Sequence, residues 1–417
     1  MRRIKIVLLV MLGILTAFLC GIFIYGMMGH NIYKAFRGGY YDHERGYVGI
    51  HLVLEQEVAI DGIDSISVSY SKNSNDVYLY EGQGDTLTVK EYNEVELNEN
   101  ELSTVSVNGS KLEIKGKRRS SRRVGAGFFH FGDGGGYTEV WLPASYKGEL
   151  TLTTSSGDIT SEMDLVLERD LKAASTSGEI TMPDVTASNV SLGSTSGNVR
   201  IENIETNRNG TAGDINIATT SGDITLKQLS GETNIGSTSG YVNAETITGN
   251  AQIATTSGDI TVQYIDGNAA VESSSGNAKI LEGSGERSIS TSSGDITIDG
   301  ADGLWQIHTT SGEVCVKGQN DSGSIETTSG DVSLEIVELN GTLDINTNSG
   351  SVNMKFLQDS AFDFSADTTS GNIDTFFDDD LKFSKRGNSA QGTHGQNPQG
   401  NSIRIDTTSG DVRIKSY

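Results

Sequence analysis

The stretch "IATTSGDIT" occupies residues 217–225, returns unchanged at residues 253–261, and has near copies along much of the 417-residue chain. Seven consecutive copies place the glycine of their "SG" pair 18 residues apart. These glycines are Gly222, Gly240, Gly258, Gly276, Gly294, Gly312 and Gly330. A fixed period of this kind is typical of a repeat architecture, in which each period forms one structural unit that stacks on the next.

Aliphatic residues recur in phase with these glycines. Around Gly222 they are Ile217, five residues before it, and Ile224 and Leu226, two and four residues after it. The last two are two positions apart, as neighbours on one face of a β-strand must be. Because each period repeats these positions, like residues stack at the strand separation of about 4.8 Å and form parallel sheets around a narrow core. The pattern predicts an all-β fold, a single-stranded parallel β-solenoid with rungs of 18 residues.

The intervals between the aliphatic positions bear on the handedness of the coil. A left-handed solenoid of hexapeptide repeats would show an aliphatic residue at every sixth position, whereas the intervals here are seven and two. We therefore favour a right-handed β-helix, the hand that parallel crossovers usually take. The "SG" glycines between residues 157 and 410 predict roughly 13 rungs and a length of about 60 Å.

The repeated "TSGD" predicts a corner between two inward-facing strands. Glycine takes positive φ at little cost, and a neighbouring Asp or Asn side chain hydrogen-bonds nearby backbone. We therefore interpret the seven glycines as structural turn residues. The Thr or Ser three positions before each glycine, such as Thr219, is expected to point inward and to hydrogen-bond along its own column. The Asp after the glycine, such as Asp259, stands in alternate rungs and supplies too few oxygens for Ca²⁺, so no metal ion and no cofactor is predicted.

A long apolar run lies near the N-terminus. Residues 6–28 carry no charge over 23 positions, and as a helix they would span about 34 Å, more than the hydrocarbon core of about 30 Å. We interpret residues 1–28 as a transmembrane signal-anchor that contacts the lipid bilayer through residues 6–28; a cleaved signal peptide would have a shorter apolar core. Basic residues before the span favour a cytoplasmic N-terminus. The protein is thus expected to be a single-pass protein of the cell membrane with an extracellular β-domain.

The rest of the chain divides into three parts. Residues 29–57 mix Gly, Tyr and charges without a clean period and predict a juxtamembrane connector. Residues 58–150 hold several runs of alternating apolar and polar residues, which predict an N-terminal β-strand region that caps the solenoid. Residues 151–417 carry the "SGD" and "SGN" repeats of the solenoid, with a polar loop excursion expected at residues 378–400.

One basic cluster interrupts an acidic chain. It contains Lys117, Arg118, Arg119, Arg122 and Arg123. A solvated loop between two strands is the plain interpretation, and a contact with an anionic wall polymer or lipid headgroup is the functional one. The net charge of −24 argues against a nucleic-acid partner.

Catalytic chemistry has little support in the sequence. The six His residues show no metal-ligand spacing, and the charged residues outside the Asp column are scattered. A β-helix that cleaves polysaccharides would need carboxylates converging from neighbouring rungs, so a polysaccharide-active enzyme is kept only as an alternative. Cys315 lies between inward-facing Val314 and Val316, and alternation directs its thiol outward.

Several segments together resemble a bacterial family of envelope proteins described as "putative adhesin, LiaG-like". They are "SISVSYSKNSNDVYLYEGQGDTLTVKEY" (65–92), "TEVWLPASYKGELTLTTSSGDIT" (138–160), the serial "TTSGDI" units and "IRIDTTSGDVRIKS" (403–416). The resemblance implies a membrane-tethered, surface-facing β-solenoid of a bacterium, without assigned enzyme activity.

These observations favour a non-enzymatic adhesion, interaction or spacer module of the cell envelope, with an envelope polymer or protein as its partner. Because some members of the family accompany envelope-stress regulators, an accessory or regulatory role is the second hypothesis. A polysaccharide-active β-helix enzyme is the third.

Overall fold

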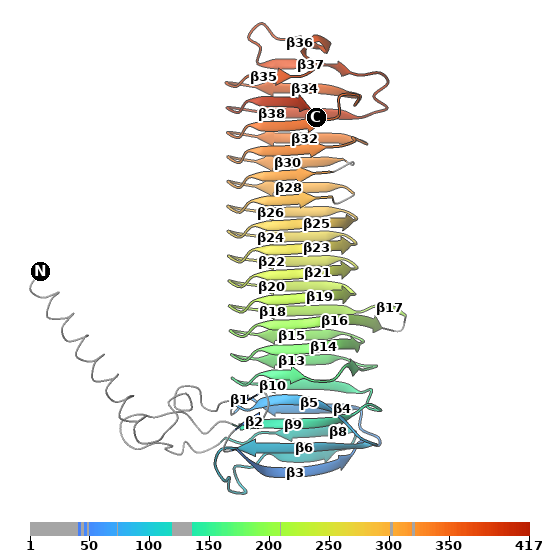
Figure 1. Cartoon of the computed structure of the whole chain (residues 1–417), viewed down its shortest axis with the longest axis vertical. Helices are drawn as coiled ribbons and strands as arrows, with labels where there is room; N and C mark the ends of the chain where they lie inside the picture. Colours follow the sequence, from blue (N-terminus) through green and yellow to red (C-terminus); the bar gives the residue numbers. More distant parts are fainter. Residues whose placement is uncertain are drawn as a thin grey trace, which may run out of the picture.

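The computed structural model describes residues 41–42, 46–47, 50–72, 74–118, 136–208, 210–300, 303–318 and 322–417. These residues form two long, mostly parallel sheets and one short 3-10 helix, η1 (Asp378–Asp380). The sheets face each other along the whole length of an elongated body (Figure 1). The predicted membrane span at residues 6–28 lies outside the described residues. No helix in the described part of the chain has the length and apolarity needed to cross a bilayer.

Each rung gives one strand to each sheet. The first sheet contains β4 (Ser65–Tyr70), β7 (Thr104–Asn108), β8 (Lys111–Lys115), β10 (Glu149–Thr154), β13 (Leu171–Ser175), β15 (Val190–Ser194), β18 (Asp214–Thr219), β20 (Glu232–Ser237), β22 (Ala251–Thr255), β24 (Ala269–Ser273), β26 (Arg287–Thr291), β28 (Trp305–Thr309), β30 (Gly323–Thr327), β32 (Thr342–Thr347), β34 (Phe362–Thr368), β36 (Leu381–Phe383), β37 (Ser389–His394) and β38 (Ser402–Thr407).

The second sheet contains β3 (His51–Ala59), β5 (Asp76–Gly82), β6 (Thr86–Asn93), β9 (Gly136–Pro143), β11 (Ile159–Ser161), β12 (Leu165–Val166), β14 (Ile180–Ala187), β16 (Val199–Arg208), β17 (Thr211–Ala212), β19 (Ile224–Ser230), β21 (Val242–Thr248), β23 (Ile260–Asp266), β25 (Ala278–Ser284), β27 (Ile296–Asp299), β29 (Val314–Lys317), β31 (Val332–Ile336), β33 (Val352–Phe356), β35 (Ile373–Thr375) and β39 (Val412–Ser416). A separate two-stranded sheet pairs β1 (Tyr41–Asp42) with β2 (Gly46–Tyr47).

The register confirms the 18-residue rung. Ile217 pairs with Ile235, which pairs in turn with Ile253, and Ile224 pairs with Val242. All five side chains are buried, because alternation along each strand directs them into the space between the sheets. The central rungs therefore form the parallel β-solenoid that the aliphatic columns predict.

A further inward column lies beyond the predicted ones. Leu229, Ile247 and Ile265 stand seven residues after their corner glycines and are buried. After this column the chain turns back to the first sheet through a second corner. Gly249 occupies this corner with φ +118°, a conformation that L-residues rarely adopt. Each rung thus closes with two corners of different construction.

The N-terminal rungs stack out of chain order. β4 pairs in parallel with both β10 and β8, and β5 pairs in parallel with both β11 and β9. The rung β4–β5, which comes first in the chain, therefore lies between the rung β8–β9 and the rung β10–β11. Residues 58–150, predicted as a cap, also supply two full rungs, which brings the described residues to fifteen rungs. Because the pairing order differs from the chain order, no 18-residue period reveals them.

The C-terminal rungs exchange in the same way. β38 pairs with β32 on one edge and with β34 on the other, while β39 lies between β33 and β35. The last rung of the chain is therefore enclosed between two earlier ones. The predicted loop excursion at residues 378–400 is only partly loop, because it contains η1, β36 and β37. These elements lie at the end of the solenoid (Figure 1).

Antiparallel strands and aromatic packing close both ends. At the N-terminal end β6 pairs with β9 and β3, and β7 pairs with β8; at the other end β37 pairs with β34 and β36. β3 begins at His51, so the predicted connector at residues 29–57 ends in a strand. Phe356, Phe362 and Phe377 are buried and in ring contact, whereas Phe383 is exposed. Such caps protect sheet edges that would otherwise pair with other chains.

Candidate functional site

The predicted turn glycines form a continuous buried column at the first corner. A Cβ placed on Gly258 would lie 1.9 Å from the carbonyl oxygen of Gly240, and one on Gly276 would lie 1.9 Å from that of Gly258. None of the seven glycines has a positive φ. The prediction of structural glycines is consistent with this geometry, but the predicted reason was wrong. Glycine is needed because successive corners touch, leaving no room for a side chain.

The Thr or Ser three positions before each glycine is buried, as predicted. In five of these corners its hydroxyl accepts a hydrogen bond from the glycine N–H, as Thr219 Oγ1 does from Gly222 N at 2.7 Å. In some rungs the hydroxyl donates to the glycine carbonyl of its own corner, as Thr219 does at 2.8 Å and Thr255 does at 2.6 Å. Thr255 Oγ1 also lies 3.1 Å from Ser273 Oγ, its column neighbour. Bonding along the column is therefore partial, because the hydroxyls also bond within their own corners.

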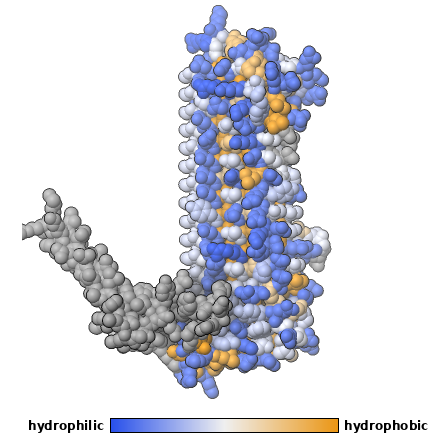
Figure 2. Space-filling model, in the orientation of Figure 1, coloured by the Kyte–Doolittle hydropathy of each residue, from blue (hydrophilic) through white to orange (hydrophobic). Residues whose placement is uncertain are grey.

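The Asp or Asn after the glycine joins one rung to the next. Asp259 Oδ1 accepts the backbone N–H of Asn277 at 2.8 Å, and Asn277 Oδ1 accepts that of Asp295 at 2.8 Å. Asp and Asn serve equally because only an acceptor oxygen is used. The recurring "TSGD" is thus a structural corner, in which the Asp or Asn bonds the next rung and the buried hydroxyl bonds its own corner. Figure 2 shows this corner as a pale column along the edge opposite β17.

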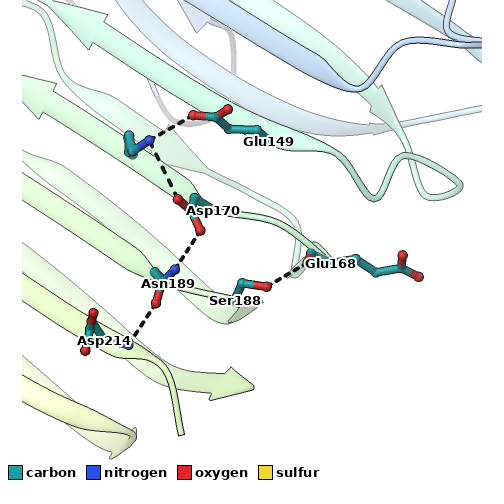
Figure 3. Close-up of polar contacts among 7 residues, drawn as sticks. Glu149, Glu168, Asp170, Ser188, Asn189 and Asp214 are labelled. Carbon is teal, nitrogen blue, oxygen red and sulfur yellow. Dashed lines mark hydrogen bonds and ion pairs between the residues drawn. The ribbon is translucent and has the colours of Figure 1, made fainter. Parts of the chain in front are cut away.

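The second corner has its own polar column in the early rungs. Asn189 Nδ2 donates to Asp170 Oδ1 at 2.8 Å, and Asn189 Oδ1 accepts the backbone N–H of Asp214 at 3.0 Å (Figure 3). Lys172 donates to Glu149 Oε1 at 2.9 Å and lies 3.7 Å from Asp170 Oδ2. These groups connect four successive rungs, so the polar residues of both corners hold the stack together.

The basic cluster is described only in part. Lys117 Nζ donates to the carbonyl of Glu99 at 3.3 Å, and Arg118 is exposed. Arg119, Arg122 and Arg123 lie outside the described residues. The contact with an anionic polymer therefore stays a prediction.

An aromatic cluster covers the outer face of β5, β6 and β9. Its members are Tyr78, Tyr80, Tyr92, Tyr137 and Trp141. The rings of Tyr80 and Trp141 stack with centroids 4.9 Å apart, and those of Tyr92 and Tyr137 stack at 4.6 Å. The cluster arises because β5 and β9, which are distant in the chain, pair in register. Sequence analysis did not single out these residues.

A carboxylate lies within the aromatic cluster. Glu139 Oε2 accepts hydrogen bonds from Trp141 Nε1 at 3.0 Å and from Tyr92 OH at 3.5 Å. Burial and the Glu139 charge raise the pKa of the Tyr92 phenol. Lys90 Nζ lies 5.5 Å from the Trp141 ring centroid and 3.3 Å from Glu55 Oε1. Aromatic rings beside polar groups suit contacts with sugars, peptides or a lipid interface.

The described ranges hold no group of three or more His, Cys, Asp and Glu side chains placed to bind a metal ion. Cys315 is a free, half-buried thiol, and burial raises its pKa. A thiol in that state is a weak nucleophile at neutral pH.

Comparisons place the chain among known proteins. A "putative cell adhesion protein" of Clostridium sporogenes has 9% identity, a TM-score of 0.15, and coverage of 87% of this chain and 99% of its own. A "putative adhesin" of Parabacteroides distasonis has 17% identity, a TM-score of 0.22, and coverage of 72% and 96%. No curated protein matches the chain.

Sequence identities and TM-scores this low carry no argument about function, which therefore rests on the chain's own residues. A family model gives the firmer result. The model of the Toastrack DUF4097 family matches residues 63–287 and 267–415, which together cover most of the chain and nearly all of the solenoid. The chain therefore belongs to the Toastrack DUF4097 family.

Proposed function

We propose that this protein is a non-enzymatic interaction and spacer module of the bacterial cell envelope. In this proposal residues 6–28 span the membrane with the N-terminus in the cytoplasm, and the solenoid lies outside the cell. The fifteen rungs, spaced at about 4.8 Å, would then extend roughly 65 Å. A body of this length can present its outer faces well beyond the lipid surface.

One observation carries the proposal: the Asp and Asn residues that recur at the corner are used to join one rung to the next. Asp259, Asn277 and their equivalents accept backbone N–H groups, and the Thr column bonds the corner glycines. A motif repeated for catalysis would instead leave reactive groups converging on a cavity. What remains for partners is the outward-facing surface, including the aromatic cluster and the predicted basic contact at Lys117, Arg118, Arg119, Arg122 and Arg123.

The test is a binding and turnover screen of the full-length chain on intact cells. Cells that display the protein are expected to retain purified envelope polymers or to adhere to a polymer-coated surface, without degrading the polymer. Release of soluble sugars would instead favour a polysaccharide-active enzyme. Protease added outside the cells should cut the β-domain and spare the N-terminus. A protected β-domain would refute the proposed orientation.

The regulatory alternative predicts a different result. If the protein acts through an envelope-stress system, its deletion should change a stress reporter even where no polymer binds. Replacing residues 6–28 with an unrelated membrane span should then abolish the effect on the reporter. If deletion instead abolishes polymer binding, and the chain restores that binding with either membrane span, the result would support the interaction module.

A further inference from the structure

A polar groove of about 700 Å³ lies on the first sheet near the C-terminal end. Its floor is one outward-facing column over five neighbouring strands, with each member paired in register to the next. The column consists of His308, Glu326, Asn346, Asp406 and Asp367. Every floor residue thus comes from a different rung, and the chain order of the last two is reversed by the exchange of β38 and β34.

The groove has two walls. Exposed corner residues, among them Thr328, Thr369 and Thr408, form one side. Arg386 and Asn388, from the connection between β36 and β37, form the other. This connection is held in place because the carbonyl of Asn388 accepts the backbone N–H of Thr368 at 2.8 Å. The end cap therefore covers the last rung and also supplies one wall of the groove.

The floor carries excess negative charge. Asp367 and Asp406 stand directly opposite each other on neighbouring strands, an arrangement that costs stability between like charges. Arg404, in the adjacent column, donates from Nε to Asp406 Oδ2 at 2.9 Å, and this bond raises the pKa of Arg404. Glu326 Oε2 lies 3.5 Å from His308 Nδ1. The carboxylates of the floor, those of Glu326, Asp367 and Asp406, thus outnumber the two guanidinium groups beside it, those of Arg386 and Arg404.

The chemistry of the groove selects a class of ligand. An ammonium group placed between two carboxylates forms charge-assisted hydrogen bonds and removes their repulsion. The Asn amides and Thr hydroxyls around it both donate and accept, which matches the hydroxyl groups of a sugar. The excess of carboxylates disfavours an anionic polymer. We propose that this groove binds a polysaccharide that carries free amino groups, with an ammonium held between Asp367 and Asp406.

This inference rests on the proposed interaction function and gives it a ligand class and a site. Binding is measured by calorimetry on the full-length chain in nanodiscs of zwitterionic lipid, at mildly acidic pH and low salt. The probes are a hexamer of glucosamine, the same hexamer fully N-acetylated, and polygalacturonate. We expect the glucosamine hexamer to bind, the acetylated hexamer to bind about threefold to tenfold more weakly, and polygalacturonate not to bind in the groove.

Two variants separate the groove from the rest of the surface. Asp367→Asn removes one charge of the facing pair while keeping the side chain's shape, and should weaken the glucosamine hexamer by about threefold to tenfold. Its melting temperature without ligand should stay the same or rise, because the repulsion with Asp406 is gone. Glu272→Gln is the matched control. Glu272 is exposed in the same column, two rungs before His308, and outside the groove.

The outcomes distinguish the two proposals. Equal affinity for the two hexamers, or equal loss in the Asp367 and Glu272 variants, would overturn the groove assignment. If neither hexamer binds while cells displaying the chain still retain envelope polymer, the groove proposal fails and the interaction module stands. If polymer retention also fails, both proposals fall.

Discussion

Replacement of Gly258 by Ala tests why glycine recurs at the corner. A Cβ on Gly258 would lie 1.9 Å from the Gly240 carbonyl oxygen, whereas real Cβ contacts are essentially never shorter than 3.0 Å. The two corners must therefore separate by more than 1 Å. Thr256 N and Ser257 N both donate to the carbonyl of Thr238, at 3.2 and 2.9 Å. A separation of that size takes both bonds beyond hydrogen-bond length.

The cost follows from these contacts. Two lost backbone hydrogen bonds contribute about 0.5 to 1.5 kcal/mol each, and forced overpacking adds about 1 to 3 kcal/mol. The variant should therefore lose about 2 to 6 kcal/mol of local stability. Because solenoid rungs couple mainly to their neighbours, the loss should concentrate in the rungs that contain Gly240 and Gly258.

Hydrogen exchange read by mass spectrometry on the full-length chain measures this directly. Protection should fall around residues 238–260 and remain normal several rungs away. Gly236→Ala is the matched control, because a Cβ on Gly236 meets nothing within 4 Å and its φ is not positive. That variant should change stability by about 0.5 kcal/mol or less.

Gly258→Asn separates steric contact from backbone conformation. Asn tolerates positive φ better than Ala does, so a requirement for positive φ predicts that Asn is the milder change. Close stacking predicts that Asn costs at least as much as Ala. If Gly258→Ala behaved like Gly236→Ala, or if Asn restored protection, the stacking explanation would be refuted.

Changes at four further places test other features of the fold. Asp259→Asn should leave melting nearly unchanged because an acceptor oxygen remains, whereas Asp259→Ala should cost about 1 kcal/mol by losing the bond to the next rung; equal melting of the two would contradict this role. Partial desolvation raises the pKa of Asp158, although the residue is exposed, so the folded state is favoured by protonation and that advantage is lost as pH rises through the folded pKa. Asp158→Asn should therefore raise the melting temperature at neutral pH, with a smaller gain under acid conditions, and a pH-independent difference would count against the desolvation effect. Arg287 is buried with its guanidinium bonded to four backbone carbonyls, so Arg287→Lys should cost about 2 to 4 kcal/mol in thermal or denaturant unfolding, and a neutral result would refute its structural role. Deletion of residues 402–417 should expose both neighbouring rungs to hydrogen exchange, whereas protection lost on one side alone would contradict the exchanged order.

Much of the solenoid could be predicted because its signal is local and periodic. Ile217, Ile224 and Leu226 lie where the 18-residue phase places them, since each is fixed by alternation within a strand and by repetition between rungs. The inward column that contains Leu229 was not predicted, because later rungs do not keep an aliphatic residue at this position. Gly283, for example, stands at the equivalent place. The guanidinium of Arg287 enters the core nearby and bonds the carbonyl of Ile265 at 2.9 Å. A charged residue in an inward column is invisible to a search for aliphatic ones.

The groove could not be predicted, because its residues meet only through pairing that departs from chain order. Asn346 and Asp406 are 60 positions apart and become neighbours when β38 inserts beside β32. Asp367 then pairs with the opposite edge of the same strand. The local sequence around each is an ordinary repeat, so nothing marks it as a member of a shared site. Arg386 comes from a segment that reads as loop.

The exchanged order of the rungs places a strand that can be covered at each end of the solenoid. The rung of β38 and β39 is paired on both edges, because it lies between the rung of β32 and β33 and the rung of β34 and β35. The rung of β34 and β35 is followed by residues 376–401, which supply β37 to pair with β34. Placing that rung outermost lets the chain cap itself. At the other end, β8 and β9 lie outermost and are covered by β7 and β6. The exchange thus protects the sheet edges, and at the C-terminal end it also creates the wall of the groove.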